Sequence, residues 1–299
     1  MKSFSVIFFI SILFLTSCGE KYEQKGSAEY INEIQNWDQK RAKNLKHETG
    51  WLNLVGLYWL EEGVNTFGSD KSNNIVFPSN APLQMGSFVL NDSIITVKIN
   101  DDVDVLIDSQ LVKEAVLKSD IEENTTIMSY GSLRWYAIVR DGGKFGIRLR
   151  DLQAPLIKNF EGIERFPINE DWRIEAKWIP LDPPKELVIP NIIGTISEAK
   201  AYGRLDFEVD DKTYSLYPTG QESLFIIFAD QTSGVETYGA GRFLYTDGPD
   251  SNNVVILDFN KAYNPPCAFT KYATCPLPPR ENQLKIRITA GEKNYGEVH

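Results

Sequence analysis

Short runs of β-branched and aromatic residues, separated at close intervals by Gly, Asn, Asp and Pro, constrain the fold of this chain more than any other feature. Such runs predict strands, because their side chains pack well on a pleated surface while the intervening residues form turns. They dominate the sequence from Trp51 onward, with clear cases at residues 94–99 and 103–107 and a hairpin pairing 134–139 with 145–150. The sequence therefore predicts a mainly β protein.

A second series of such runs follows a proline-rich stretch at residues 179–184. Its expected strands are 202–209, 213–217, 224–229, 242–246, 254–259 and 284–289. We expect two β-rich halves packed on each other, each sandwich-like or barrel-like, at residues 49–170 and 171–299. The proline-rich stretch marks either a boundary or a crossover inside one sandwich.

One amphipathic helix is expected at residues 28–48, ahead of the strands. Its apolar residues recur at three- and four-residue steps: Tyr30, Ile31, Ile34, Trp37, Ala42 and Leu45. This spacing places them on one helical face, and Ser27 is available as the N-cap.

The first seventeen residues have the order of a signal peptide. Lys2 precedes an apolar run at residues 6–15 that is too short to span a bilayer. The following Leu15-Thr16-Ser17-Cys18 resembles the lipobox of bacterial lipoproteins. That resemblance implies cleavage before Cys18 and lipidation of its thiol, so residues 1–17 would be removed and residues 18–27 would form a flexible tether. The alternative is a buried N-terminal helix with an incidental cysteine.

Gly19 bears on the destination of such a lipoprotein. Retention at the inner membrane usually needs Asp after the lipidated cysteine, and this chain has Gly there. The lipobox resemblance therefore implies a lipid anchor in the outer membrane, with the folded part on either the periplasmic or the cell-surface face.

The densest motif lies near the C-terminus, at residues 258–279, and reads DFNKAYNPPCAFTKYATCPLPP. It resembles the hallmark of the DUF1684 family of bacterial and archaeal proteins. The resemblance continues in residues 50–60 (GWLNLVGLYWL), 65–69 (NTFGS), 162–167 (GIERFP) and 237–244 (TYGAGRFL). It implies a family identity but no activity.

Two cysteines in this motif, Cys267 and Cys275, enclose seven residues. In the oxidising compartment of a lipoprotein we expect them to form a disulfide. The chemical alternative is a thiolate nucleophile at Cys267 with His47 as its base, because His299 is the last residue. Without clustered histidines the pair does not indicate a metal site, and no cofactor is expected.

Polar residues around this loop are the candidate ligand-binding residues: Arg242, Asp258, Asn260, Tyr263 and Asn264. They come from strand ends and a stiff loop, and amides with phenols suit a small polar ligand or a glycan. Arg148 and Asp151, at the end of the 134–150 hairpin, could join them. The alternative is structural: Asp258 and Asn260 cap turns, and Arg242 pairs with Asp258.

A hydrolase is the enzymatic alternative. Asp258 or a partner acid would act as base, and Arg242 or Asn264 would stabilise charge. The acids that could form a glycosidase pair are Asp206, Glu208, Asp210, Asp230, Glu236 and Asp258.

Two further patterns fall in the first half. The run Trp51, Leu54, Leu57, Tyr58 and Trp59 suits either a sugar-stacking platform or, as we favour, a core strand or the seam to the helix. Residues 63–69 and 74–78 are similar to the opening of forkhead-associated domains, which implies a sandwich. Ser69 stands where those domains have arginine, and no Ser-x-x-His follows, which counts against phosphothreonine binding; the alternative is a glycine-bounded hairpin.

The charge balance limits the classes of binding partner that we expect. The chain has 31 basic and 41 acidic residues, a formal charge of −10, which argues against nucleic acid and anionic lipid headgroups. We therefore expect a lipid-anchored envelope protein that binds a small molecule or glycan near the 258–279 loop. A hydrolase and a non-catalytic assembly or structural lipoprotein are the alternatives.

Overall fold

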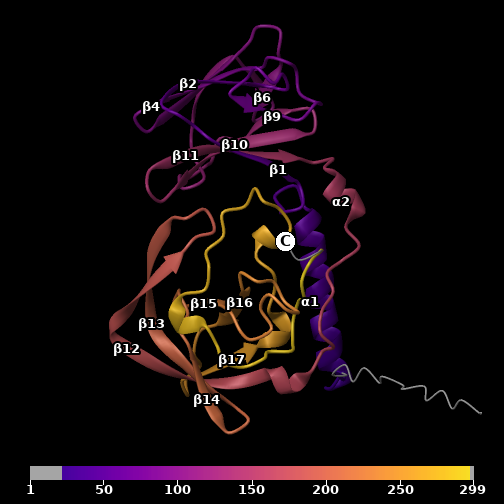
Figure 1. Cartoon of the computed structure of the whole chain (residues 1–299), viewed down its shortest axis with the longest axis vertical. Coiled ribbons are helices and arrows are strands. Elements are labelled where there is room, and N and C mark those ends of the chain that lie inside the picture. The colour runs from indigo at the N-terminus through magenta and orange to yellow at the C-terminus, as the bar shows by residue number, and fades with distance from the viewer. Residues whose placement is uncertain (1–21, 297–299) are drawn as a thin grey trace, which may run out of the picture.

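The structure is a computed structural model that describes residues 22–296. The fold is mainly β, as predicted, with one group of sheets at each end of an elongated molecule (Figure 1). The predicted signal peptide, the lipobox-like segment with Cys18, and His299 lie outside the described residues. No helix within residues 22–296 has both the length and the apolar character needed to cross a membrane.

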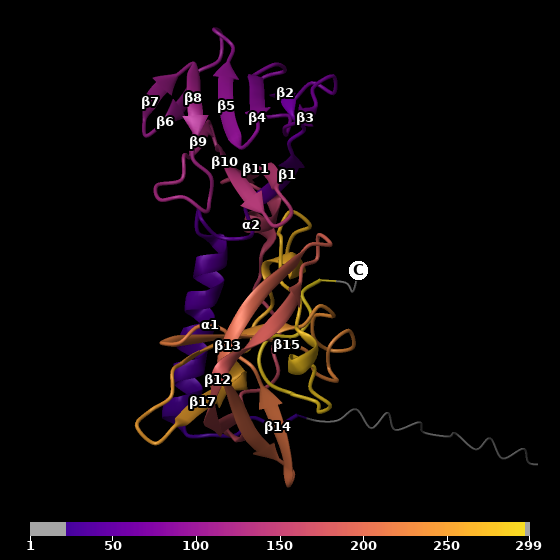
Figure 2. The same cartoon turned by 90° about the vertical axis from the view of Figure 1, so that its left-hand side faces the viewer.

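The long helix α1 spans Ala28–Lys46, confirming the amphipathic pattern. Ser27 caps it by accepting a 3.1 Å hydrogen bond from the backbone N–H of Tyr30. Tyr30, Ile34 and Leu45 are buried on one face. Although it precedes the first half in sequence, α1 runs along the second half (Figures 1 and 2).

The first half consists of two sheets that share one core. The six-stranded sheet has the order β1 (Leu54–Trp59), β11 (Lys144–Asp151), β10 (Leu133–Arg140), β9 (Met128–Tyr130), β6 (Val105–Ile107) and β7 (Gln110–Val112). The five-stranded sheet has the order β3 (Ile75–Val76), β2 (Gly63–Gly68), β4 (Gly86–Asn91), β5 (Ile94–Ile99) and β8 (Glu114–Leu117). Phe67 and Phe88 from one sheet pack with Trp135 and Leu149 from the other, which makes this half a sandwich.

The β10–β11 hairpin, expected from the sequence, has one face in this core and the other outside it. Trp135 and Ala137 lie in the core, and because side chains alternate along a strand, Arg134 and Tyr136 lie on the opposite face. Arg150 is paired with Arg134, and Arg148 with Tyr136, so the four side chains share that outer face.

The second half contains a four-stranded sheet, ordered β14 (Lys212–Leu216), β13 (Ile196–Val209), β12 (Arg173–Pro190) and β17 (Val254–Asp258). Two more strands, β15 (Ser223–Phe228) and β16 (Arg242–Asp247), pair beside it. Phe207, Phe228 and Leu257 meet in a shared core. The short helices are α2 (Pro155–Asn159), η1 (Glu170–Trp172), η2 (Phe259–Lys261), η3 (Pro266–Ala268) and η4 (Arg280–Asn282).

The proline-rich stretch lies inside β12. The β12–β13 ladder is interrupted between Pro180 and Lys185 and resumes afterwards, because prolines have no N–H to donate to it. The stretch therefore interrupts a long hairpin rather than linking the two groups of sheets.

The predicted strand at residues 284–289 is wrong. The segment is irregular, although Leu284 and Ile288 are buried as an alternating strand would require. Its backbone bonds instead to the backbone of Ala229 and Gln231, at Leu284 N–H and Ile286 O. The backbone of Ile288 bonds to two charged side chains: its N–H donates to the Asp230 carboxylate, and its carbonyl accepts from Arg242. The sequence correctly indicated alternating burial, but the backbone of this segment does not pair with a neighbouring strand.

The expected tether also needs correction over its described part. Tyr22 packs edge-on against Phe166 and donates a 2.9 Å hydrogen bond to Glu236. Lys25 forms a bridge with Asn169 and an ion pair with Asp171. Residues 22–27 therefore contact the folded body: the Tyr22 ring packs on it, and Lys25 pairs with it through a backbone bridge. A free linker would be surrounded by water instead.

Candidate functional site

The loop after β17 is closed by a disulfide between Cys267 and Cys275, whose Cα atoms are 6.2 Å apart. The predicted disulfide is thus confirmed. Both sulfurs are bonded to each other, so Cys267 is not a thiolate in this state. His47, the proposed base, directs its ring Nδ1 to Thr49 at 2.9 Å. The cysteine-nucleophile alternative therefore has no support in this geometry.

The closed loop is attached to both halves of the molecule. Ile192 N–H donates to Cys275 O at 3.0 Å, and Leu277 N–H donates to Pro190 O at 2.7 Å, which adds the loop to the tip of the β12–β13 hairpin. On its other side, Arg140 and Arg148 of the first half both donate to the Thr274 hydroxyl. The loop is consequently held in one place.

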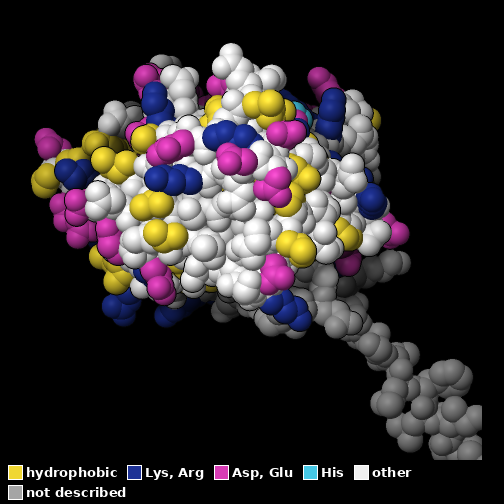
Figure 3. All heavy atoms as spheres, turned by 90° about the horizontal axis from the view of Figure 1, so that it is seen from above, with side chains coloured by type: hydrophobic (Ala, Val, Ile, Leu, Met, Phe, Trp, Pro, Cys, Tyr) yellow, Lys and Arg dark blue, Asp and Glu magenta, His cyan; other side chains and the backbone are white. Residues whose placement is uncertain are grey.

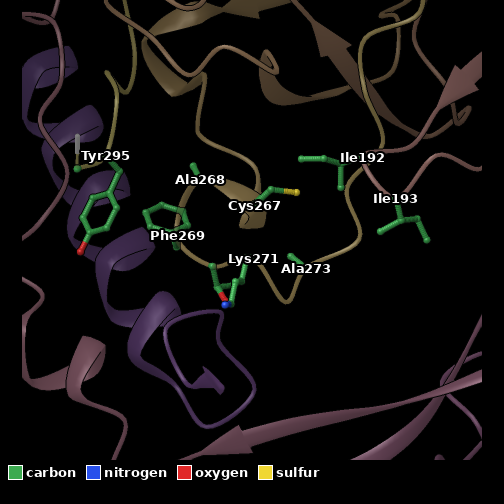
Figure 4. A pocket seen from close by; sticks show the side chains of 10 residues that line it. Ile192, Ile193, Cys267, Ala268, Phe269, Lys271, Ala273 and Tyr295 are labelled. Atoms are coloured by element: carbon green, nitrogen blue, oxygen red, sulfur yellow. The ribbon is translucent and has the colours of Figure 1, made fainter. Parts of the chain in front are cut away.

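A cavity of about 600 Å³ opens beside this loop. In Figure 4, Phe269 and Tyr295 lie beside α1, Ile192 and Ile193 lie on the other side, and Cys267 and Ala273 lie between them. The Phe269 and Tyr295 ring centroids are 4.8 Å apart. The walls are mainly apolar, with Thr270 and Lys271 as polar neighbours, a composition typical of small-molecule sites. We call this cavity the loop pocket.

Arg242, the first sequence-predicted ligand residue, is 1% exposed and lies outside the loop pocket. Its Nη2 is 3.1 Å from the Asp230 carboxylate and 3.0 Å from Ile288 O, and its Nη1 donates to Ala290 O. Burial lowers its pKa and Asp230 opposes that shift. The expected structural pairing with Asp258 is wrong, because Arg242 pairs with Asp230.

Asp258 and Asn260 form a buried polar cluster with Tyr30 of α1. The Tyr30 hydroxyl donates to Asp258 at 2.8 Å, and Asn260 Nδ2 donates to the Tyr30 oxygen at 2.9 Å. Burial, and next the charge of Asp258, raise the pKa of Tyr30. Asp258 also accepts from Asn260 N–H at 3.1 Å, so the predicted turn cap is present.

Tyr263 and Asn264 lie one step further along the chain. Arg41 of α1 stacks over the Tyr263 ring at 4.5 Å, and burial raises the pKa of that phenol. Asn264 is fully buried, and its Nδ2 donates to Lys293 O at 2.7 Å. The structure thus brings four of the five predicted residues close to α1, while their role toward a ligand stays a prediction.

The hydrolase alternative calls for an acid with a raised pKa in a cleft beside Asn264. Glu292 meets part of this requirement: it accepts from Asn264 N–H at 2.7 Å, and burial raises its pKa against the attraction of Arg41. Its side chain is fully buried, however, and it lines none of the cavities described for residues 22–296.

The other expected residues lie elsewhere. Arg204 holds Asp206 on β13, and Asp151 contacts Asn80. In the aromatic run, Leu54 is buried, Trp51 is half-buried and Trp59 is 37% exposed, so it is a seam rather than an open platform. No group of three or more His, Cys, Asp or Glu within residues 22–296 is placed to hold a metal.

Sequence reasoning missed the residues of the loop pocket that lie outside the 258–279 motif. Ile192 and Ile193 stand in a hairpin turn, and Ile192 is 44% exposed. Two adjacent isoleucines are unusual in a turn, and this was the available signal. Tyr295 carries no comparable signal, since nothing in the sequence relates it to Phe269.

Comparisons with known proteins agree with the motif. The profile of a family described as "Protein of unknown function (DUF1684)" matches residues 158–293. An uncharacterized protein of Haloarcula marismortui is 30% identical; the match covers 46% of this chain and 78% of that chain, with a TM-score of 0.38. The FHA structure of Rv0020c is 13% identical over 33% of this chain and 92% of that chain, with a TM-score of 0.22. No curated protein matches the chain.

Proposed function

Because the chain belongs to the DUF1684 family, whose activity is unknown, we propose from its own geometry that it is a lipid-anchored envelope protein that binds a small ligand in the loop pocket. The observation that carries this proposal is the coincidence of that cavity with the disulfide-closed loop of the family motif. A loop that is already held in one conformation lowers the conformational-entropy cost of binding a ligand.

The pocket walls suggest the ligand class. Phe269 and Tyr295 offer ring faces, and Lys271 and Thr270 offer polar contacts at their side. A sugar ring has one apolar face and hydroxyls at its edge, so a glycan residue or a ring-shaped metabolite suits this combination.

Ile193→Asp tests the pocket. The change places a charge on an apolar wall, so any compound that stabilises the wild type should lose its effect on the melting temperature. The matched control is Ile196→Asp, on the same hairpin but 63% exposed and outside the pocket, which should keep the full shift. The measurement is a thermal-shift screen of oligosaccharides and metabolites. A panel without a single stabiliser, or a stabiliser that Ile193→Asp retains, would count against the proposal.

The anchor has its own test. Cys18→Ala should move the protein from the membrane fraction to the soluble fraction and abolish labelling by a fatty-acid analogue, because that thiol carries the acyl chains. Glu20→Ala, two residues away, should change neither. Unchanged membrane retention of Cys18→Ala would defeat the anchoring proposal while leaving the pocket untouched.

An anchor at Cys18 would keep the folded body close to the bilayer. Tyr22 already packs on Phe166, so only the three residues 19–21 lie between the proposed anchor at Cys18 and the body. From Cys18 to Tyr22 the chain spans at most about 14 Å when fully extended.

The assembly alternative would be favoured by a flat apolar patch on the first half. Figure 3 views that end of the molecule, and its hydrophobic side chains lie in small groups separated by charged ones. This pattern is ordinary for a solvated surface, so binding is the function we propose.

A further inference from the structure

A second cavity, of about 280 Å³, lies where three segments meet: the chain leaving α1, the loop after β8, and the β10–β11 hairpin. Two guanidinium groups, those of Arg134 and Arg150, line it together with the hydroxyls of Thr49, Thr125 and Tyr136. We call it the arginine pocket. None of its residues lines the loop pocket.

Arg150 forms the inner wall and is only 8% exposed. Its Nη1 donates to Gly50 O and, at 2.7 Å, to Asn53 Oδ1, while its Nη2 donates to the Tyr136 hydroxyl at 3.2 Å. All of these acceptors are neutral, and no carboxylate within residues 22–296 forms an ion pair with it. A buried cation without a counter-ion is costly, so this arrangement favours an anion from outside the chain.

Arg148 adds a second buried charge on the same face. It is 4% exposed, its Nε has no hydrogen-bond partner, and it forms no ion pair in the described part of the chain. Arg148 and Arg150 both lie over the Trp51 ring, at 6.0 and 5.8 Å. The nearby acid Asp120 is already paired with Arg140. Positive potential therefore accumulates here although the whole chain carries −10.

Arg134 is the outer wall. It stands directly opposite Arg150 in the β10–β11 register, a like-charge pair that destabilises a sheet unless something neutralises it. Its Nη1 donates to the carbonyls of Gly131 and Leu133, both at 2.8 Å, which fixes its position. Its Nε and Nη2 make no hydrogen bond to residues 22–296, so an edge of the guanidinium is left for a ligand.

We propose that the arginine pocket binds the oxyanion of a small ligand, a phosphate or a carboxylate group. Arg134 would donate from its Nε and Nη2 edge in the bidentate manner that guanidinium groups use with such anions. Arg150 supplies charge from the inner wall, while the Thr125 hydroxyl donates to Ser119 O and the Thr49 hydroxyl contacts His47 Nδ1, so the two arginines carry the binding. Glu48, the one acid in the lining, is exposed and opposes binding.

The test is an NMR titration of the full chain with inorganic phosphate and, separately, with acetate. We expect saturable shifts of the Thr49 and Thr125 amide signals that sodium chloride does not reproduce. Stronger binding of phosphate assigns the site to phosphate esters, and stronger binding of acetate assigns it to carboxylates.

Three variants test the direction of the expected changes in anion affinity. Arg134→Gln should weaken binding about tenfold, the loss of one charge-assisted bidentate contact. Glu48→Gln should tighten it about threefold by removing a repulsive charge. Arg280→Gln, which removes an exposed arginine elsewhere, should change nothing. Arg150 is left intact because it ties Gly50 and Asn53.

Two results would overturn the proposal: shifts that chloride reproduces, or an affinity for both anions that is equal in wild type, Arg134→Gln and Glu48→Gln. Because the readout is local to Thr49 and Thr125, failure here is distinguishable from failure of the loop pocket, which is read by the Ile193→Asp thermal shift.

Discussion

Arg242→Ala is expected to lower the free energy of unfolding by about 3 to 5 kcal/mol, the cost of breaking a buried ion pair from one side. The change leaves the buried Asp230 carboxylate without its cation and removes the donors to Ile288 O and Ala290 O. These two carbonyls belong to the irregular segment that replaces the expected last strand. Urea unfolding followed by fluorescence measures the loss.

The matched control is Arg204→Ala, which breaks the ion pair with Asp206 on β13. That pair is bidentate, with both contacts at 2.7 Å, but its side chains are 35% and 20% exposed, so its loss should cost at most about 1 kcal/mol. Equal losses for Arg242→Ala and Arg204→Ala would show that Arg242 does not hold the segment.

Glu292→Ala is the second large change, with an expected cost of about 3 kcal/mol. The fully buried Glu292 carboxylate accepts from Arg41 Nε at 3.0 Å and from Asn264 N–H at 2.7 Å. Removing it leaves the Asn264 N–H unsatisfied and deprives Arg41 of its carboxylate. It also removes a tie between α1 and the C-terminal segment. A cost below about 1 kcal/mol would contradict this assignment.

Glu292→Gln tests the pH dependence of the same contact. The pKa of Glu292 is raised above its ordinary value of 4.5 by burial, so the folded state binds more protons than the unfolded state in that range. The stability that Glu292 contributes is therefore present below about pH 4.5 and declines as the pH rises through the folded-state pKa. As the pH rises above about 4.5, the free energy of unfolding of the wild type should fall relative to that of Glu292→Gln. A difference between the two that does not change with pH, or that grows in favour of the wild type, would contradict this prediction.

Much of the fold could be predicted from local pattern. Residues 94–99 coincide with β5, and the 134–150 hairpin and α1 begin and end within two residues of their expected limits. These elements have strong periodicity and clear turns or caps, which depend on near neighbours in the chain. The segment at 284–289 shows the limit: its alternation is real, but its backbone bonds to both backbone and side-chain groups distant in sequence.

The candidate site was predictable only in part. The disulfide follows from two cysteines eight positions apart, and the motif at 258–279 does border a cavity. The predicted ligand-binding residues of that motif, however, lie against α1, since Tyr30 and Arg41 supply partners that no pattern near residue 260 reveals. The cavity is lined by other residues of the motif, within 267–273, together with the hairpin tip and the C-terminal segment.

The placement of α1 has a consequence for how the protein is made. Its contacts with Asp258 and Glu292 join residues 228 and 251 positions apart. During synthesis the helix therefore emerges from the ribosome long before the partners of Tyr30 and Arg41. Contacts this distant in sequence slow folding, so the second half is expected to complete its fold only after Glu292 has been synthesised. A recombinant fragment limited to residues 158–293 would have every one of these partners but not the helix itself.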